Sequence, residues 1–459
     1  MTGTGLVWRS TGANSVTIKS PSAAANTEGV VLADDGSINL NTITVSNGGN
    51  LGSHADTYQT AGSVNYISAQ EVEQKRGTSV GDFISGIPVV LNGDSRNSGA
   101  LDVNIRGLQG QGRVPVVIDG ASQEQTVYRG YNGARSGSFV DPDFPNIGYE
   151  GLSPWKGGEE ILNTSMENES LLFKGNFQLG IDHALELSFM RYTSEFGEIM
   201  PTRIGTHTSA IGVFQSEPDT LDLKTYNARY RWSPESDLID LKINAFRTDM
   251  DHRATNLLPG WGGIVTTSVN YAQTIRNGIN VSNESLIEVV PGEFRLEYGG
   301  GWQYETLGLP KDIDDKQWVI NHSEFPPRSG KRTEKNVFMN GKWETTPQWK
   351  AAAGIRYSSF RTSDDNNSMK MIGNWPNFEY ELIPGKVTHV SGHGISNHAS
   401  LSWEPLDDLQ LYGRYSDTVR MPSIFETLKG FSTAYLPAQD LSRKRPEASS
   451  LVSIKPLKI

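Results

Sequence analysis

Hydrophobic and polar residues alternate along the chain from residue 165 onward. The alternation runs through 171–179 and 185–189, and again through 226–232 and 239–245. A period of two places successive side chains on opposite faces of a strand, so each stretch predicts a β-strand with one apolar face. Short turn sequences separate the paired stretches. The pattern predicts four tight hairpins, with turns at 180–183, 233–236, 345–348 and 405–408.

The two faces of these expected strands differ in chemistry. One face carries the charged side chains of Arg229, Arg231, Asp240 and Lys242. The apolar face carries tryptophans within about two residues of the tight turns, as an interfacial girdle requires: Trp232, Trp343, Trp349 and Trp403. A soluble two-sheet sandwich would bury its tryptophans and could not hold unpaired charges in a dry core. We therefore expect an up-and-down transmembrane β-barrel with short turns at one end and long polar loops at the other.

Composition agrees with a barrel and excludes several other classes. No apolar run reaches the roughly 18 residues of a spanning helix, whereas a spanning strand needs only about 10. The 459 residues include 48 Gly, 16 Tyr, 10 Trp and no Cys, which excludes disulfides and thiolate metal sites. The formal net charge of −11 argues against a nucleic-acid partner. The chain carries no phosphate-binding loop and no nucleophile motif, so we expect no enzymatic activity.

A different pattern precedes the barrel-like region. Residues 101–120 read as a strand, a glycine turn and a second, β-branched strand at 114–118, closed by the turn residues Asp119 and Gly120. Upstream, Ser68 and Glu71 have the spacing of a capping box, which predicts the start of a helix. Taken alone, the run could be a hairpin in any α+β domain.

The sequence Ile105-Arg106-Gly107, followed by a β-branched strand ending in Asp119-Gly120, resembles the plug domain of TonB-dependent outer-membrane receptors. The resemblance implies a mainly β protein in which an N-terminal α+β plug domain precedes an antiparallel transmembrane β-barrel. It stops at Phe144. The rest has room for about 12 to 16 strands at roughly 20 to 25 residues each, so we expect a barrel incomplete relative to the 22 strands of the family.

The resemblance implies four regions. These are a remnant of a periplasmic signalling domain at 1–19, a linker at 20–60, a plug incomplete at its C-terminal end at 61–144, and a partial barrel at 145–459. The first 20 residues have no signal-peptide pattern, so we expect the natural chain to begin further upstream. Within the linker, 40–47 is either a stray strand or an extended segment that adds to a partner's sheet edge. It resembles a TonB box, which implies TonB binding by Thr42, Ile43, Thr44 and Val45.

Candidate ligand residues come from two loops. Residues 419–422 resemble the first of two short boxes in haem and haemoglobin receptors, and 437–447 is a loose second box. The family's haem-binding histidines have no counterpart here, and His389 and His393 lie in a segment without helical pattern, so we expect no metal site. Tyrosinate can ligate haem iron and arginine can hold a carboxylate. The alternative is that these are ordinary loop residues. The candidates are Tyr128, Arg129, Tyr131, Arg135, Arg420 and Tyr435.

The function implied by the resemblance is active uptake of an iron chelate, haem or a ferric siderophore, across the outer membrane. TonB, with ExbB and ExbD, would supply the energy, and the outer-membrane lipid would surround the barrel. The chelate would be cargo, with no intrinsic cofactor. Two alternatives stay open. The chain is a truncated, non-functional receptor remnant, or it is a signalling transducer of the same family, as residues 4–18 suggest.

Overall fold

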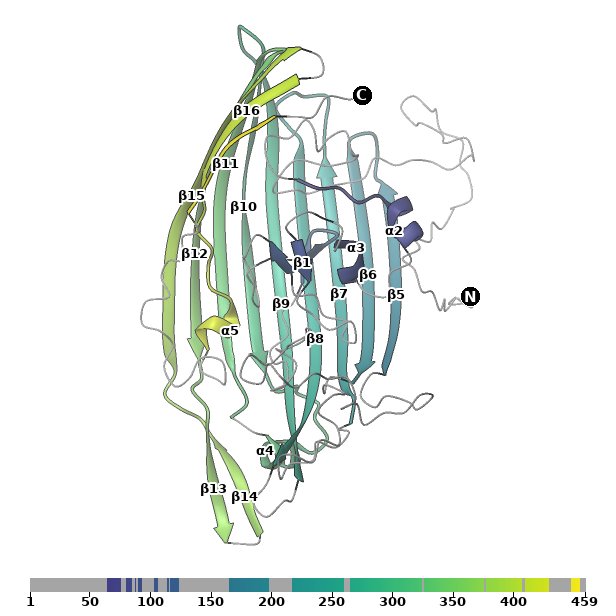
Figure 1. The fold of residues 1–459 in the computed structure, drawn as a ribbon, viewed down its shortest axis with the longest axis vertical. Helices are drawn as coiled ribbons and strands as arrows, with labels where there is room; N and C mark the ends of the chain where they lie inside the picture. The colour runs from purple at the N-terminus through teal and green to yellow at the C-terminus, as the bar shows by residue number, and fades with distance from the viewer. Residues whose placement is uncertain are drawn as a thin grey trace, which may run out of the picture.

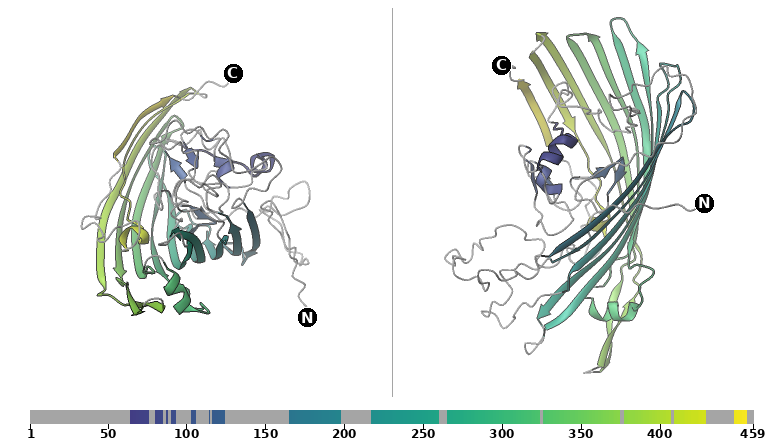
Figure 2. Two further views of the ribbon diagram at one scale, coloured as in Figure 1. Left: turned by 60° about the horizontal axis from the view of Figure 1, so that its bottom comes forward. Right: turned by 90° about the vertical axis from the view of Figure 1, so that its right-hand side faces the viewer.

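The large sheet of this protein is curved and antiparallel, and a small α+β region lies on its concave side (Figures 1 and 2). The computed structural model describes residues 64–75, 80–84, 87, 90–92, 103–105, 114, 116–123, 165–197, 217–259, 265–323, 326–374, 377–406, 409–428 and 447–454. The sheet has eleven strands in the order β17-β16-β15-β12-β11-β10-β9-β8-β7-β6-β5. In the described part of the chain it is open, with β5 at one edge and β17 at the other.

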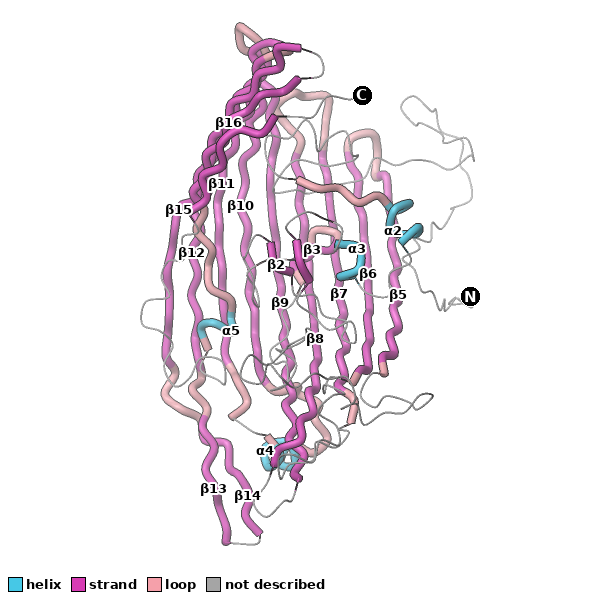
Figure 3. The backbone as a smooth tube through the Cα atoms, in the orientation of Figure 1, coloured by secondary structure: helices cyan, strands magenta, loops and turns pink. Residues whose placement is uncertain are grey.

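The strands of the sheet are long, as membrane-crossing strands must be. Their bounds are β5 Met166–Gln178, β6 His183–Phe196, β7 Asp219–Trp232, β8 Leu241–Pro259, β9 Val265–Glu288, β10 Glu293–Gly308, β11 Gly330–Thr346, β12 Trp349–Asp364, β15 Thr388–Leu406, β16 Leu409–Asp417 and β17 Glu447–Ile454. Strands β13 (Ser368–Asn374) and β14 (Asn377–Ile383) form a separate hairpin that projects from one end of the sheet (Figures 1 and 3). Because this hairpin is an insertion, β12 pairs directly with β15.

All four predicted hairpins are confirmed. They are the pairs β5–β6, β7–β8, β11–β12 and β15–β16. A further tight turn, at 289–292, joins β9 to β10. The long connections lie at the opposite end, where helix α4 (Lys316–His322) packs beside β14. In the described residues the wall has eleven strands, one fewer than the lower end of the predicted 12 to 16, because β13 and β14 form a hairpin outside the sheet.

Side chains on the sheet are arranged with apolar groups outside and polar groups inside. Glu305 is 2% exposed, while Val337 on the convex face is 59% exposed. One outward row across the sheet joins Tyr230, Ile243, Val281, Gly300, Val337, Tyr357 and Ile395. The adjacent inward row joins Arg229, Asn244, Asn280, Gly301, Asn336 and Ser358. A wall between lipid and a polar lumen requires this inversion, so the sandwich alternative is wrong.

The tryptophan girdle is present at the short-turn end. Trp349 and Trp403 stack with ring centroids 5.5 Å apart, and each is 40% exposed. Trp343, also on the outer face, donates from Nε1 to the carbonyl of Pro291 at 3.1 Å. Indole rings with one satisfied polar edge suit the boundary between lipid and water.

The α+β region consists of short elements. They are α2 Ala69–Lys75, α3 Val80–Ile84, β1 Val90–Asn92, β2 Val103–Ile105, β3 Val117–Ile118 and β4 Ala121–Ser122. The capping box is confirmed, because Glu71 N donates to Ser68 Oγ at 3.2 Å and Ser68 N donates to Glu71 Oε2 at 2.7 Å. The fold is therefore mainly β, with an α+β region ahead of an open barrel wall. None of the helices in the described part of the chain combines the length and apolar character that crossing a bilayer requires.

Strand pairing in the α+β region differs from the simplest expectation. The strands on either side of the glycine run do not pair with each other in the described residues. Instead β2 pairs with β1, and β3 pairs with β4 through the Asp119-Gly120 turn. A two-residue turn brings its own flanks into register at once, whereas a longer glycine-rich run leaves its flanks free to take other partners.

Candidate functional site

The turn between β3 and β4 touches the concave face of the wall. Asp119 has φ of +51° and Gly120 has φ of +82°, the pair of positive angles that the Asp-Gly sequence favours in a tight hairpin. Gln123 N donates to the carbonyl of Val116 at 2.9 Å and closes the hairpin. Gly120 is also required for space, because a Cβ there would lie 2.9 Å from Nδ2 of Asn244.

A cluster of four charges holds the side chain of this turn. Lys174 Nζ on β5 lies 3.1 Å from Asp119 Oδ1 and 3.2 Å from Glu186 Oε1 on β6. Arg229 Nε on β7 donates to the same Glu186 oxygen at 2.7 Å, and its Nη2 lies 3.8 Å from Asp119 Oδ1. The side chains of Arg229 and Glu186 are only 5% and 4% exposed. Buried charges of this kind are stable only when paired, so Asp119 is part of the wall's charge balance.

Two wall amides hold the backbone of the turn. Asn227 Nδ2 donates to the carbonyl of Asp119 at 2.5 Å, and Asn244 Nδ2 donates to the carbonyl of Gly120 at 2.8 Å. Both asparagines are buried on the inward phase of β7 and β8. The wall therefore contacts the turn through its carboxylate and through two successive carbonyls.

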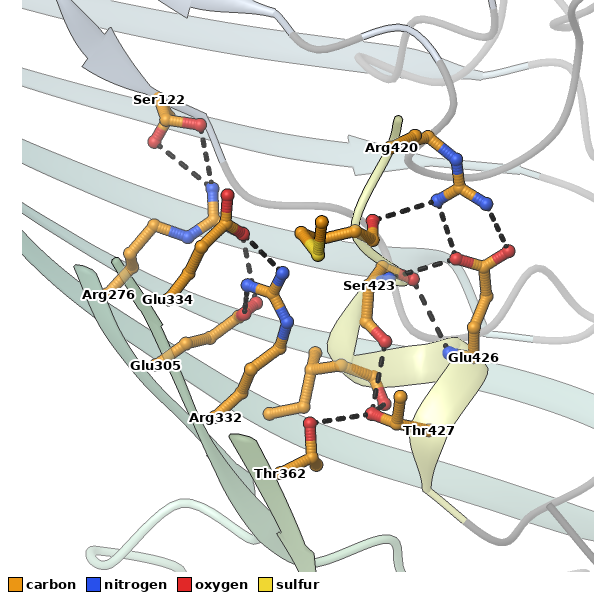
Figure 4. A network of polar contacts seen from close by, with 12 residues as sticks. Ser122, Arg276, Glu305, Arg332, Glu334, Thr362, Arg420, Ser423, Glu426 and Thr427 are labelled. Atoms are coloured by element: carbon orange, nitrogen blue, oxygen red, sulfur yellow. Dashed lines mark hydrogen bonds and ion pairs between the residues drawn. The ribbon is translucent and has the colours of Figure 1, made fainter. Parts of the chain in front are cut away.

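A second contact lies further along the same hairpin. Arg276 Nη1 on β9 donates to Ser122 Oγ at 3.0 Å, and its Nη2 donates to Glu305 Oε1 at 2.9 Å (Figure 4). The same Nη1 also donates to the carbonyl of Gln123 at 2.8 Å. Glu305 also lies 3.7 Å from Arg332 Nη1, and Arg332 pairs with Glu334. In this cluster the wall balances its own charges, and the hairpin supplies neutral acceptors.

Helix α5 (Ile424–Thr427) lies on the concave face of the wall, beside β11 and β12. It belongs to the segment that leaves β16. Arg420 Nη1 and Nη2 bond Glu426 Oε2 and Oε1 at 2.6 and 2.8 Å, and Glu426 also completes the capping box with Ser423 (Figure 4). Arg420, a predicted ligand residue, is thus bonded to Glu426 of α5.

A third ionic contact centres on Asp240, which lies in the connection between β7 and β8 and pairs with one residue of each strand. Asp240 Oδ1 accepts from Arg231 Nε at 2.6 Å, and its Oδ2 lies 3.0 Å from Lys242 Nζ. Burial alone would raise the pKa of Asp240. The hydrogen bonds and charges of Arg231 and Lys242 outweigh burial and hold this pKa below its ordinary value. Three of the four charged inward residues expected from the sequence therefore pair with one another, and the fourth, Arg229, pairs with Glu186.

Of the predicted site residues, the structure describes Ile105 at the end of β2, the Asp119-Gly120 turn and Arg420. Asp119 and Arg420 each make ion pairs, but with different parts of the wall. The remainder lie outside the described residues: Thr42, Ile43, Thr44, Val45, Arg106, Gly107, Tyr128, Arg129, Tyr131, Arg135 and Tyr435. The expected signalling remnant at 1–19 and the linker at 20–60 also lie outside them.

Sequence reasoning did not single out the wall residues that receive the turn. These are Lys174, Glu186, Asn227, Asn244 and Arg276. Their signal in the sequence is a polar residue on the inward phase of an alternating strand. That signal marks dozens of positions equally and does not indicate which of them face the hairpin.

Comparison with known proteins gives two family matches. The model described as "TonB dependent receptor-like, beta-barrel" matches residues 175–450, and the "TonB-dependent Receptor Plug Domain" matches residues 56–146. The Asp119-Gly120 hairpin lies in the second range and all the wall strands that it contacts lie in or at the edge of the first. The hairpin and wall are thus a contact between plug and barrel.

Individual relatives agree with these matches. The hemophilin receptor of Acinetobacter baumannii is 23% identical, over 65% of this chain and 43% of that protein. The hemophore receptor HasR of Serratia marcescens, solved with its hemophore HasA and heme, has a TM-score of 0.52 at 15% identity, covering 79% of this chain and 64% of HasR. The chain spans less than two thirds of either protein. With a barrel match over more than half of its residues and a plug match ahead of it, the chain belongs to the TonB-dependent receptor family.

Proposed function

We propose that this chain acts in the active uptake of an iron chelate across the outer membrane, with energy supplied by TonB together with ExbB and ExbD. The observation that carries the proposal is the attachment of the Asp119-Gly120 turn to the inner face of the wall. A plug domain that is held in the lumen by a few hydrogen bonds and ion pairs can be displaced by a mechanical force applied to the chain. Each charge-assisted bond contributes about 1.5–3 kcal/mol, so the contacts are strong together but break one at a time.

The proposed division of the chain follows from this role. Residues 20–60 link the energy source to the plug at 61–144, and 145–459 supply the barrel wall. Thr42, Ile43, Thr44 and Val45 would add as a strand to the sheet edge of TonB, because an extended β-branched segment suits that mode of binding. A pull on this segment would reach the Asp119 turn through the covalent chain.

The cargo we favour is haem, since the hemophilin receptor and HasR are both similar to this chain. Tyr128, Arg129, Tyr131, Arg135 and Tyr435 would contact it from the plug and from the outer loops. Arg420 would join them only after its bonds to Glu426 break, because both terminal nitrogens of its guanidinium donate to Glu426 in this structure. A ferric siderophore is the alternative cargo.

Growth on a single iron source tests the proposal. Cells that lack their own haem and siderophore receptors would express the full chain with an export signal. They would be starved of iron and supplied with haem or with a ferric siderophore, in strains with and without TonB. We expect growth on haem that requires both the chain and TonB. Growth on neither iron source, with the chain present in the outer membrane, would overturn the proposal.

A further inference from the structure

The four charges around Asp119 sum to zero only while the turn is seated. Lys174 and Arg229 are balanced by Glu186 and Asp119. When the turn leaves, Glu186 balances one of the two cations and the wall keeps one net positive charge. An uncompensated charge at a poorly hydrated position is costly, so the vacated wall attracts an anion.

When the turn leaves, two neutral side-chain amides of the wall also lose their hydrogen-bond acceptors. Asn227 and Asn244 both point Nδ2 at carbonyls of the turn, and both side chains are buried. Neither Oδ1 has a hydrogen-bond partner in the described part of the molecule. Donors from β7 and β8 thus face the same place as the cations from β5 and β7. A group with several acceptor oxygens and one negative charge satisfies all of them, and a carboxylate has this chemistry.

The neighbouring charged cluster, around Arg276, keeps its net charge when the hairpin leaves. Arg276 and Arg332 are balanced by Glu305 and Glu334, all four of which belong to the wall. The hairpin offers Arg276 a hydroxyl and carbonyls, which carry no net charge. Loss of the hairpin therefore leaves this cluster neutral. Only the Asp119 cluster, among the two that hold the hairpin in the described structure, changes its net charge.

We propose that Lys174, Arg229, Asn227 and Asn244 form a carboxylate-binding station on the barrel wall. Asp119 fills the station while the plug is seated. When the turn is withdrawn, the station receives a carboxylate of the passing cargo. This second role rests on the proposed function, whereas the affinity of the vacated wall for a carboxylate does not.

Chemical rescue tests the affinity directly. Asp119→Gly removes the carboxylate and tolerates the positive φ of that position. The thermal unfolding midpoint of the full chain in detergent micelles would be measured in sodium acetate, in sodium chloride of equal ionic strength, and with neutral acetamide. We expect acetate to raise the midpoint of the variant by several degrees above chloride, to leave the wild type unchanged, and to lose its effect when Lys174→Met is added.

Acetamide should have no such effect, and Arg332→Met should leave the response to acetate intact. Asp119→Ser vacates the station in the same way and carries the same expectation if the glycine variant does not fold. No specific response to acetate in a folded Asp119 variant would overturn the proposal. Because this assay needs no iron chelate and no TonB, a negative result leaves the uptake proposal standing, and failed uptake leaves a positive result standing.

The second role needs a cargo comparison in cells. Lys174→Met would be assayed for uptake of haem and of haem dimethyl ester, whose carboxylates are blocked. If the station handles cargo, uptake of haem falls by about tenfold, the loss expected for one charge-assisted bond, while uptake of the ester changes little. An equal fall for both would mean that Lys174 acts through the plug alone, and would overturn the cargo role.

Discussion

Leu428 packs directly over Gly330. A Cβ atom on Gly330 would lie 2.4 Å from Leu428 Cδ2 and 2.5 Å from the carbonyl oxygen of Ser363. Leu428 is fully buried, in an apolar cluster with Ile424, Phe425, Ala272 and Leu307. The missing side chain of Gly330 is therefore what lets the α5 segment approach the wall.

Gly330→Ala tests this packing. The added methyl group must displace Leu428 or move backbone, so we expect the free energy of unfolding to fall by about 1–3 kcal/mol. Gly413→Ala on β16 is the matched control, because its Cβ would meet nothing within 4 Å. Urea unfolding in detergent micelles measures both. Equal losses in the two variants would contradict the proposed role of Gly330.

The ion pair between Arg420 and Glu426 is open to a double-mutant cycle. We expect Arg420→Met and Glu426→Gln to destabilise the protein separately and to show a coupling energy of about 1 kcal/mol, since the pair is bidentate but partly exposed. Unfolding of the two single variants and the double variant gives the coupling. Strict additivity would show that Arg420 does not hold α5 through Glu426.

The lowered pKa of Asp240 predicts a defined response to acid. The contribution of Asp240 to stability is complete above the pKa of an unfolded aspartate, about 3.9, and is lost as the pH falls through the lower pKa of the folded state. Asp240→Asn should therefore unfold at a lower temperature than the wild type at pH 7. This difference should shrink below about pH 4. A difference that is constant with pH would contradict the prediction.

The proposed TonB segment predicts a localised loss of uptake. Ile43→Pro removes a backbone donor and fixes φ, so it should abolish strand addition and reduce TonB-dependent uptake to the level of cells lacking TonB. Ile43→Val keeps the β-branched side chain and should retain uptake. Equal amounts of each variant in the outer membrane must be shown by immunoblotting. Normal uptake by the proline variant would remove residues 42–45 from the coupling step.

The wall was predictable because its signal is local. An alternating strand that ends in a turn such as 345–348 specifies a hairpin without reference to any other part of the chain. The turn at 289–292 was missed because Val289 and Val290 extend the β-branched run, although Val290 is fully exposed in the structure. Apolar residues in a turn are therefore hard to separate from the end of a strand.

The contacts of the candidate site were not predictable for the opposite reason. Asp119 could be recognised as a turn residue, but its partner Lys174 lies 55 residues away and resembles many other inward polar positions. Arg420 was predicted as a ligand residue from a short box, while its pairing with Glu426 depends on a one-turn helix that no period reveals. Local patterns specify elements, and they do not specify which elements meet.

The spacing of contacts along the chain also orders the assembly of the molecule. Neighbouring wall strands are consecutive in the chain, apart from the β13–β14 insertion, so the wall can grow by successive hairpins with short loop closures. The Asp119-Gly120 turn, in contrast, bonds Lys174, Asn227 and Asn244, which lie 55, 108 and 124 residues downstream. These bonds form only once β5, β6, β7 and β8 are paired in the sheet. The Asp119-Gly120 turn can therefore dock only after the wall strands that receive it have formed.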